Sequence, residues 1–391
     1  MEQPHAVVIG AGIGGLTAAV ALRLRGWRVT VLERAATLEP VGAGISLAPN
    51  AQRALDVIGL GDEVRPLAAW QGDAGLRTPD GRWLARTDSR AAARRFGGPL
   101  VLLHRATLAG LLTAHLPDGA VRTGTPATLT DPGAPGRPAR VATQDGDLQA
   151  DLVVGADGIN SAVRRALFPT HPGPAYTGFT TWRVVVPAPE RPFAPHETWG
   201  AGRLWGSQPL NDGRVYAYAA APAPARDRAP DEKAELLRRF GGWHHPVPGI
   251  LAAVEPEAVL RHDVHFMAEA LPAYHVGRTA LLGDAAHAMP PNLGQGGNQA
   301  IEDAIVLAHH LAPTHDDLAP ALAAYTRDRL PRTMDIVRRS ARAGRAAMLT
   351  GAPAVLRDAA IGAAGRLAPG LMLRGFAGIA DWRPPVRTYA A

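Results

Sequence analysis

The 391-residue chain contains no cysteine. This absence excludes disulfide bonds, thiolate metal sites, cysteine nucleophiles and cofactors attached covalently through cysteine. The positions of the 14 histidines show no metal-ligand spacing. A chain without cysteine suits a reducing compartment, and we therefore expect a cytoplasmic protein without a bound metal.

Lysine is almost absent, because Lys233 is the only one. The formal net charge of +6 comes almost entirely from arginine. These arginines are scattered along the chain and are not interleaved with aromatic residues, so the charge does not predict a nucleic-acid interface. Anionic cofactors are the more natural partners of such a chain.

Long uninterrupted apolar runs are also lacking. The segment 361–380 is broken by Arg366, Pro369 and Arg374, which argues against a membrane span. The apolar N-terminal stretch is explained by a strand and a helix, so we expect no signal peptide. With 47% apolar residues the chain can build a large core, as two domains or one large domain with insertions.

A glycine-rich turn follows the first apolar run of the chain, at residues 5–9. The turn is followed by a stretch rich in alanine and leucine at 16–24, so the order is strand, turn, helix. In this arrangement Gly10 permits a tight turn, Gly12 lets the backbone approach a pyrophosphate, and Gly14 and Gly15 complete the motif, with Gly15 allowing close helix packing. The motif predicts a dinucleotide site.

A second strand at residues 28–32 ends at Glu33. A carboxylate about 20 residues after the glycines accepts hydrogen bonds from an adenosine ribose and repels a 2'-phosphate. FAD and NAD both fit this position, whereas NADP does not.

Two further turns follow apolar strands. Asp157 ends the strand-like run 151–156, and Gly283-Asp284 ends the run 280–282. The loop 291–297 and a helix over 298–312 come next, and the N-terminus of that helix can favour the negative edge of a reduced flavin. This second glycine-rich loop, about 270 residues after the first, points to FAD.

The middle of the chain is of a different kind. Residues 180–187, 203–210 and 214–221 are strand-like runs rich in Trp, Tyr and Val. We predict an α/β protein in which a Rossmann-like FAD-binding domain receives an inserted antiparallel β-sheet substrate domain and a helical C-terminus follows. The expected boundaries are 1–75, 98–168 and 276–320 for the FAD-binding domain, 76–97 and 169–275 for the substrate domain, and 321–391 for the helical region.

These motifs together resemble the class A flavoprotein aromatic hydroxylases, the salicylate hydroxylase-like FAD monooxygenases. The resemblance spans residues 5–311 in order and spacing. It rests on the first glycine turn with Glu33-Arg34, Gly42-Ala43-Gly44-Ile45, the helix start at Arg105, Asp157-Gly158, and Gly283-Asp284 through Asp303.

The resemblance implies roles for individual residues. Glu33 and Arg34 would hold the adenosine half, Ala127 would offer its backbone to adenine, Arg105 would contact FAD, and Asp284 would bind the ribityl chain. Asp157 would serve FAD packing and nicotinamide use, although helix capping at a tight turn explains it as well. The remaining residues implied around the isoalloxazine are Gly44, Gly294, Gln295, Gly296, Gly297, Asn298 and, packed beside the ring, Pro291. His287 is read as a structural histidine.

The implied reaction uses NADH or NADPH as a transient reductant and O2 as co-substrate, and it transfers one oxygen atom to an aromatic or polycyclic small molecule through a C4a-hydroperoxyflavin. Because the cofactor carries this chemistry, no catalytic triad is expected. The candidates for substrate contact are Arg183, Trp205, Tyr216 and Pro291, with Trp182, Trp199 and Tyr218 also considered. Tyr216 and Tyr218 share a face if their run is a strand.

Other functions remain open at this point. A flavin-dependent epoxidase or reductase would use the same scaffold, and a non-catalytic flavin-binding or redox-sensing protein would keep the same motifs. A flavin-dependent halogenase is disfavoured, because Lys233 lies in a polar helical stretch and the Trp-x-Trp-x-Ile-Pro motif is missing. The sequence does not indicate an oligomeric state.

Overall fold

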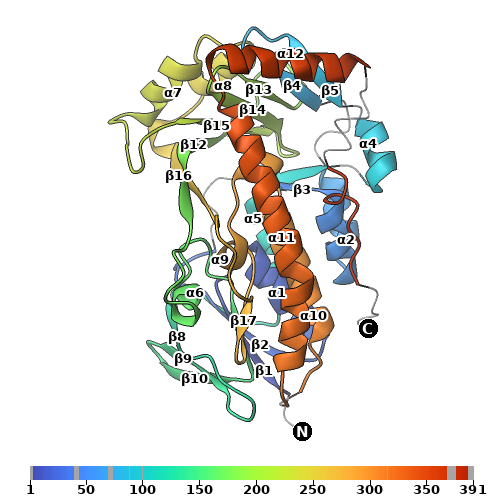
Figure 1. The fold of residues 1–391 in the computed structure, drawn as a ribbon, viewed down its shortest axis with the longest axis vertical. Helices are drawn as coiled ribbons and strands as arrows, with labels where there is room; N and C mark the ends of the chain where they lie inside the picture. The colour runs from blue at the N-terminus through green and yellow to red at the C-terminus, as the bar shows by residue number, and fades with distance from the viewer. Residues whose placement is uncertain are drawn as a thin grey trace.

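The computed structural model describes residues 3–38, 44–68, 74–87, 89–98, 100–314, 316–367 and 376–385. Gly42 and Ala43 of the third motif lie outside the described residues. The molecule is elongated, with one sheet near each end and a long helix, α11 (Ala319–Ala347), running between them (Figure 1).

A six-stranded sheet forms the first end, in the order β17-β18-β11-β1-β2-β7. All neighbouring pairs are parallel except β17 with β18. Every residue of β1 is buried, as expected for a parallel strand covered on both faces. The strands are β1 (His5–Ile9), β2 (Arg28–Leu32), β7 (Val121–Arg122), β11 (Leu152–Gly155), β17 (His275–Val276) and β18 (Thr279–Leu281).

Two helices with glycine-rich N-termini pack against each other beside this sheet: α1 (Ile13–Leu24) and α10 (Gly296–His310). Small residues of α1 make the close approach possible, since a Cβ on Gly14 would lie 2.9 Å from the Cβ of Ala300. Helix α10 begins at Gly296, two residues before the start of the predicted helix. The other helical elements of this half are α2 (Pro49–Val57), α3 (Gly61–Val64), η1 (Arg65–Leu67), α5 (Arg105–Ala114), α6 (Ala162–Leu167), α9 (Asp284–His287) and η3 (Pro291–Leu293).

Two small antiparallel sheets complete this half. One is a three-stranded meander of β8 (Ala127–Asp131), β9 (Ala139–Thr143) and β10 (Gly146–Ala150), and the other pairs β3 (Gly44–Leu47) with β6 (Val101–His104).

The other end contains a seven-stranded sheet in the order β16-β12-β15-β14-β13-β4-β5. Its pairs are antiparallel except β13 with β4. The strands are β4 (Ala74–Arg77), β5 (Trp83–Thr87), β12 (Ala175–Pro187), β13 (His196–Trp199), β14 (Leu204–Pro209), β15 (Arg214–Pro222) and β16 (Leu260–Phe266). The helical elements of this half are α4 (Ser89–Phe96), α7 (Glu232–Phe240), α8 (Val247–Ala252) and η2 (Pro256–Ala258).

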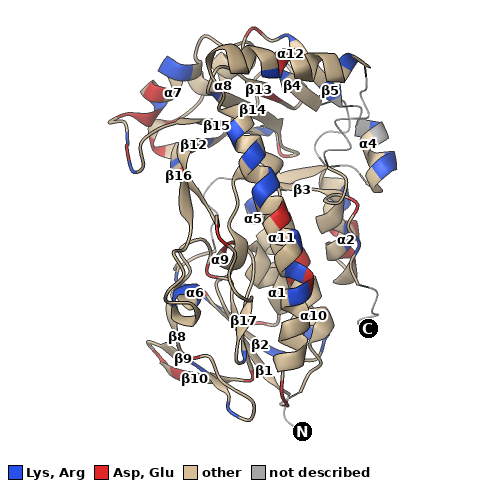
Figure 2. Ribbon diagram, viewed as in Figure 1, with Lys and Arg blue, Asp and Glu red and all other residues tan. Residues whose placement is uncertain are grey.

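The predicted fold class is confirmed: a Rossmann-like α/β part, an inserted sheet that is largely antiparallel, and a helical C-terminus. The domain boundaries stay a prediction. The first helix of the C-terminal region, α11, contacts α10 of the FAD-binding part. The next helix, α12 (Gly351–Leu367), instead lies against β5 of the seven-stranded sheet. Basic residues are spread over the molecule, with a run along α11 (Figure 2).

Candidate active site

The turn between β1 and α1 is closed by backbone contacts that only glycine permits. Gly10 has a φ of +106°, and a Cβ there would come within 2.4 Å of the carbonyl oxygen of Ala156. A Cβ on Gly15 would lie 2.0 Å from the carbonyl oxygen of Gly10. Gly12, by contrast, has open space in front of it, and its nearest neighbour there is the guanidinium of Arg105 at 3.6 Å.

The N-terminus of α1 is left open by this turn. No side chain caps it, and the glycines expose its first N–H groups toward a cavity. Free N–H groups and the positive end of the helix dipole together form a site for a phosphate.

Glu33 lies at the end of β2 and holds the neighbouring loops. Its carboxylate accepts hydrogen bonds from the backbone N–H groups of Ala11 at 2.8 Å and Ala35 at 2.9 Å. Thr125 donates its backbone N–H to the carbonyl of Glu33. This bond holds the segment before β8 next to Glu33, and Ala127, the half-buried first residue of β8, follows two positions later. Since a carboxylate has about four acceptor positions, Glu33 retains capacity for ribose hydroxyls.

The second glycine-rich loop lies across the same cavity. Gly283 has a φ of +60°, and Asp284 directly after it is exposed on the cavity wall. Gly294 ends η3 in the left-handed conformation, and α10 then begins without a side-chain cap. The open N-termini of α1 and α10 therefore face one cavity.

The cavity has a volume of about 650 Å3 and lies between these turns and the seven-stranded sheet. It brings together the following residues that the sequence analysis singled out: Gly12, Gly14, Gly15, Gly44, Arg105, Arg183, Tyr216, Tyr218, Asp284, Pro291, Gly294, Gln295, Gly296 and Gly297. The other residues that line the cavity are mainly apolar and include Ile45, Phe96, Leu102, Met289 and Leu293.

The other predicted site residues do not line this cavity: Gly10, Glu33, Arg34, Ala127, Asp157, Asn298 and Trp205. Asp157 caps α6, because its Oδ2 accepts the backbone N–H groups of Ala162 and Val163. Asn298 holds the second glycine-rich loop in place. Its side-chain amide donates to the carbonyls of Ser46 and Gly294, and its side-chain oxygen accepts the backbone N–H of Ala48.

Successive side chains along each strand of the seven-stranded sheet point to opposite faces, and only one face meets the cavity. This decides which aromatic residues reach the cavity. Tyr216 and Tyr218 share the cavity face of β15, with ring centroids 5.6 Å apart. Trp205 of β14 pairs with Ala219 and therefore points to the opposite face. There it is 1% exposed, packs on Phe240 and donates its indole N–H to Ser207. The structure thus places Trp205 in a core, away from the predicted substrate position.

Two further tryptophans also lie outside the cavity lining. Trp182 lies on the core face of β12 and donates to Glu232. Trp199 donates its indole N–H to a carboxylate of the cavity wall, Glu197, at 2.5 Å. Neither ring lines the cavity.

Glu197 and Gln208 are polar cavity residues that the sequence analysis missed. Glu197 lies on the short strand β13, and its Oε1 accepts a hydrogen bond from the hydroxyl of Tyr218 at 2.8 Å. Burial raises the pKa of Glu197 above its usual range, although the bonds from Trp199 and Tyr218 oppose this. The available signal was the two-residue spacing of Glu197 and Trp199, which places both on one face of a strand.

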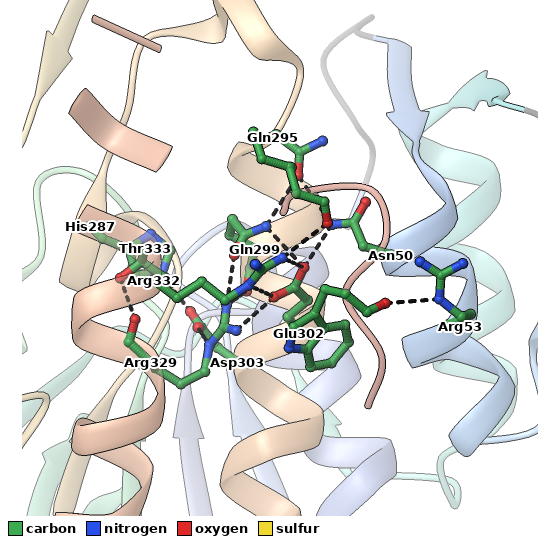
Figure 3. A network of polar contacts seen from close by, with 12 residues as sticks. Asn50, Arg53, His287, Gln295, Gln299, Glu302, Asp303, Arg329, Arg332 and Thr333 are labelled. Carbon is green, nitrogen blue, oxygen red and sulfur yellow. Dashed lines mark hydrogen bonds and ion pairs between the residues drawn. The ribbon is translucent and has the colours of Figure 1, made fainter. Parts of the chain in front are cut away.

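A buried ionic network lies behind the second glycine-rich loop (Figure 3). Arg329 of α11 pairs with Glu302 at 2.6 Å and with Asp303 at 2.7 Å, and all three are buried. Burial alone would raise the pKa of Asp303, but His287 and Arg329 outweigh it and lower that pKa to about 2. His287 contacts Asp303 at 2.5 Å inside the core, which agrees with a structural histidine.

This network reaches the cavity loop through amide side chains. Asn50 donates to Gln295 at 3.1 Å and to Glu302 at 2.7 Å, and Gln299 donates to Gln295 as well. The side-chain oxygen of Gln295, a residue of the cavity lining, therefore belongs to the network.

The C-terminal segment 376–385 forms one edge of the cavity. Phe376 and Ala380 line it, although no pattern in the sequence predicted their place there. Arg332 donates to the carbonyls of Gly378 and Ile379, while Arg53 donates to those of Ala380 and Trp382. Arginines from two distant helices therefore fix this segment.

Two kinds of feature are not found in the described part of the chain. No group of three or more His, Asp or Glu side chains is placed to hold a metal ion there. Within the same residues, no helix combines the length and apolarity needed to cross a membrane.

Comparison with known proteins agrees with this geometry. Residues 4–340 match the family described as the FAD binding domain. The chain is 39% identical to an aurachin C monooxygenase/isomerase of Stigmatella aurantiaca over 342 residues, which cover 86% of this chain and 88% of that protein. It is 37% identical to the 3-amino-4-hydroxybenzoate 2-monooxygenase PtnB3 of Streptomyces platensis, with 96% of each chain covered.

A solved structure shows the same likeness. The Klebsiella pneumoniae protein HpxO, determined with FAD and uric acid, superposes with a TM-score of 0.86 at 29% identity. The superposition covers 97% of this chain and 96% of HpxO.

Proposed function

The chain belongs to the class A FAD-dependent aromatic hydroxylases, and we propose that it uses NAD(P)H and O2 to insert one oxygen atom into an aromatic or polycyclic small molecule. The observation that carries the proposal is the single cavity faced by two open helix N-termini on one side and by Arg183 and Tyr216 on the other.

The residues around the cavity fit FAD. The uncapped N-terminus of α1, with open space at Gly12 and Arg105 beside it, would hold the pyrophosphate. Glu33, Arg34 and the backbone of Ala127 would hold the adenosine half. Asp284 would bind the ribityl chain.

The backbone from Gly294 to Asn298, with Gly44 and Pro291 nearby, would surround the isoalloxazine. Asp157 would act through packing, since its Oδ2 already caps α6.

Bound FAD would supply hydride acceptance from NAD(P)H and activation of O2. The chain itself would position the substrate and keep water away. Apolar residues such as Phe96, Leu102 and Leu293 would exclude water from the reacting atoms. The N-terminus of α10 would stabilise negative charge that develops on the bound ring.

The substrate would lie between the second glycine-rich loop and the sheet. Arg183 lines the cavity and has no carboxylate partner among the described residues, so it is available for an anionic or acceptor group of the substrate. Tyr216 would form part of an apolar wall with Pro291 opposite. The names of the relatives support such a substrate, since they describe the hydroxylation of 3-amino-4-hydroxybenzoate, urate and 6-hydroxynicotinate by those proteins.

The test begins with the visible spectrum of the purified protein. Oxidation of NADH and of NADPH is then followed in air with phenolic, indolic and polyketide compounds. We expect a flavin spectrum, oxidation stimulated by particular compounds, and a product heavier by one oxygen atom. A colourless protein that takes up no FAD would overturn the proposal.

The same assay separates the alternatives. An epoxide product would identify an epoxidase, and stimulated oxidation of NAD(P)H without oxygen insertion would identify a reductase. Bound FAD that neither NADH nor NADPH reduces would favour a non-catalytic flavin-binding or redox-sensing protein.

A further inference from the structure

A row of four residues crosses the cavity face of the seven-stranded sheet. The strand register pairs Arg183 of β12 with Tyr218 of β15, Tyr218 with Gly206 of β14, and Gly206 with Glu197 of β13. Directly paired residues of neighbouring strands point to the same face of a sheet. The row therefore has a cation at one end and a carboxyl group at the other, with a phenol between them.

Gly206 brings the phenol and the carboxyl group together. A Cβ at this position would lie 2.1 Å from the Cζ atom of Tyr218, so the tyrosine ring occupies the space of the missing side chain. The ring thus extends across β14, and its hydroxyl donates to Oε1 of Glu197 at 2.8 Å. Any larger residue at 206 would prevent this contact.

The second oxygen of Glu197 is also satisfied, because Trp199 donates its indole N–H to Oε2. With these two donors in place, Glu197 has partners when it is ionised. Burial makes its neutral form more favourable than in water and raises its pKa. Burial and the neighbouring Glu197 raise the pKa of Tyr218 well above its usual value, so this phenol stays protonated.

We propose that Tyr218 and Glu197 act as a pair that accepts a proton from an ionisable O–H or N–H group of the aromatic substrate. This inference rests on the proposed function. Tyr218 would contact the substrate and is the catalytic residue of the pair. Glu197 acts through Tyr218 and is a positioning residue and final proton acceptor.

The proton transfer balances within the pair. The substrate O–H or N–H bond breaks, and its proton passes to the Tyr218 oxygen while the hydroxyl proton of Tyr218 passes to the ionised Glu197. The substrate becomes an anion, Tyr218 remains neutral, and Glu197 becomes a neutral carboxylic acid. The negative charge thus moves onto the ring, which makes the ring richer in electrons for oxygen insertion. Arg183 in the same row stabilises that charge.

Few other charged or titratable groups surround the pair. Tyr216 lies beside Tyr218 on β15, and Arg183 lies beside it on β12. On the other side, β4 places the apolar Leu76 against Glu197. From α12, Arg357 lies over the ring of Trp199, 5.1 Å from its centroid. Tyr216, Arg183 and Arg357 are therefore the neighbouring groups whose charge can influence the pH profile of the pair.

The test compares FAD-loaded wild-type protein with Glu197→Gln and Tyr218→Phe in the NAD(P)H oxidation assay. The compounds are phenols, aminophenols and hydroxyquinolines, each beside its O-methyl or N-methyl counterpart. We expect stimulation and oxygenated product with the ionisable compounds and at least tenfold less with the methylated ones. Both variants should keep their flavin spectrum, and kcat should fall at least tenfold with a smaller change in KM.

The pH profile gives a readout that a merely structural role would not change. Wild-type kcat should fall on the acid side as Glu197 becomes protonated, at a pH above the usual range of a glutamate. Glu197→Gln should lose this limb, and Glu197→Asp should restore part of it. The control Glu257→Gln alters an exposed glutamate of η2, which is not part of this row, and should leave the profile unchanged.

The outcomes separate this inference from the proposed function. Equal activity on methylated compounds, or an unchanged pH profile in Glu197→Gln, would overturn the inference and leave the monooxygenase intact. A flavin protein that oxygenates none of the compounds would instead overturn the proposed function, and the inference would fail with it. If Glu197→Gln or Tyr218→Phe loses FAD, Glu197→Asp takes its place: an acid limb at a shifted pH supports the inference, and an unchanged limb overturns it.

Discussion

At the scale of single residues, the cavity depends on positions where a side chain is absent. Gly12 leaves room before the N-terminus of α1, Gly44 leaves room for the ring of Tyr216, and Gly206 leaves room for that of Tyr218. The first two belong to glycine motifs that the sequence displays openly. Gly206 belongs to no motif, because its role depends on the residue opposite it on another strand.

Gly206→Ala tests this dependence. The added Cβ would collide with the Tyr218 ring, and overpacking of this kind costs about 1–3 kcal/mol of unfolding free energy. The displaced hydroxyl should also lose Glu197, so turnover should fall together with the melting temperature. Gly110→Ala is the control, because this exposed helical glycine has open space around it and alanine there should be neutral or slightly stabilising.

Arg183→Ala tests the cationic end of the row. If Arg183 binds an anionic or acceptor group, its removal should raise KM about tenfold, which corresponds to roughly 1.4 kcal/mol of binding energy. The flavin spectrum should not change. Steady-state kinetics on the identified substrate measure both constants, and unchanged KM and turnover would remove Arg183 from the substrate site.

At the scale of elements, strand alternation separates the two faces of the inserted sheet. The sequence predicts that Tyr216 and Tyr218 share a face, and the structure agrees. It does not predict which face meets the cavity, since apolar and aromatic residues occupy both. Trp205 shows this limit, because its place in the core follows from pairing with Ala219 and from the helix that brings Phe240 against it.

The strand β13 carries a buried histidine whose titration should affect stability. Burial lowers the pKa of His196 to about 4, and the histidine is 1% exposed. Between about pH 6.5 and 4 the unfolded chain binds a proton that the folded chain does not, so the free energy of unfolding decreases as the pH falls. This histidine should account for up to about 3 kcal/mol of that decrease.

The check is His196→Phe, which cannot titrate. The difference in unfolding free energy between wild type and variant, measured by urea titration at several pH values, should shift in favour of the variant by that amount between pH 7 and 4. A difference that stays constant over this range would contradict the assignment.

The helix pair α10 and α11 is joined by the buried Arg329. Removing this cation takes away one partner of each of the buried carboxylates Glu302 and Asp303, and breaking a buried ion pair costs about 3–5 kcal/mol. Arg329→Met should therefore lower the melting temperature strongly and, through Gln299 and Gln295, weaken retention of FAD. Arg327→Met on the exposed side of the same helix is the control and should change neither.

At the scale of the whole molecule, the cavity collects segments from nearly the full length of the chain. The glycine turns were predictable because each is a local pattern of strand, turn and helix. The contributions of Phe376 and Ala380 were not predictable, since they depend on contacts between residues more than 300 positions apart, such as Arg53 with Ala380. Glu197 was missed for a related reason, because its four-residue strand has too little pattern of its own.

The long-range closure of the cavity leads to a prediction about coupling. Arg53 donates to the carbonyls of Phe96, Ala380 and Trp382, so it joins α2, the end of α4 and the C-terminal segment at one edge of the cavity. Arg53→Leu removes all three bonds without touching the proposed contacts to FAD. Water would then reach the reacting atoms more easily, and more of the O2 consumed would be reduced to hydrogen peroxide by the electrons of NAD(P)H instead of being used to oxygenate the substrate.

We expect the variant to retain its flavin spectrum and to oxidise NAD(P)H at a similar rate, with at least twice the hydrogen peroxide per NAD(P)H consumed and correspondingly less oxygenated product. Arg342→Leu, at an exposed arginine of α11, should behave as wild type. If Arg53→Leu forms product as efficiently as the wild type, closure by the C-terminal segment does not protect the reaction, and the apolar lining from the loops and the sheet is sufficient to exclude water.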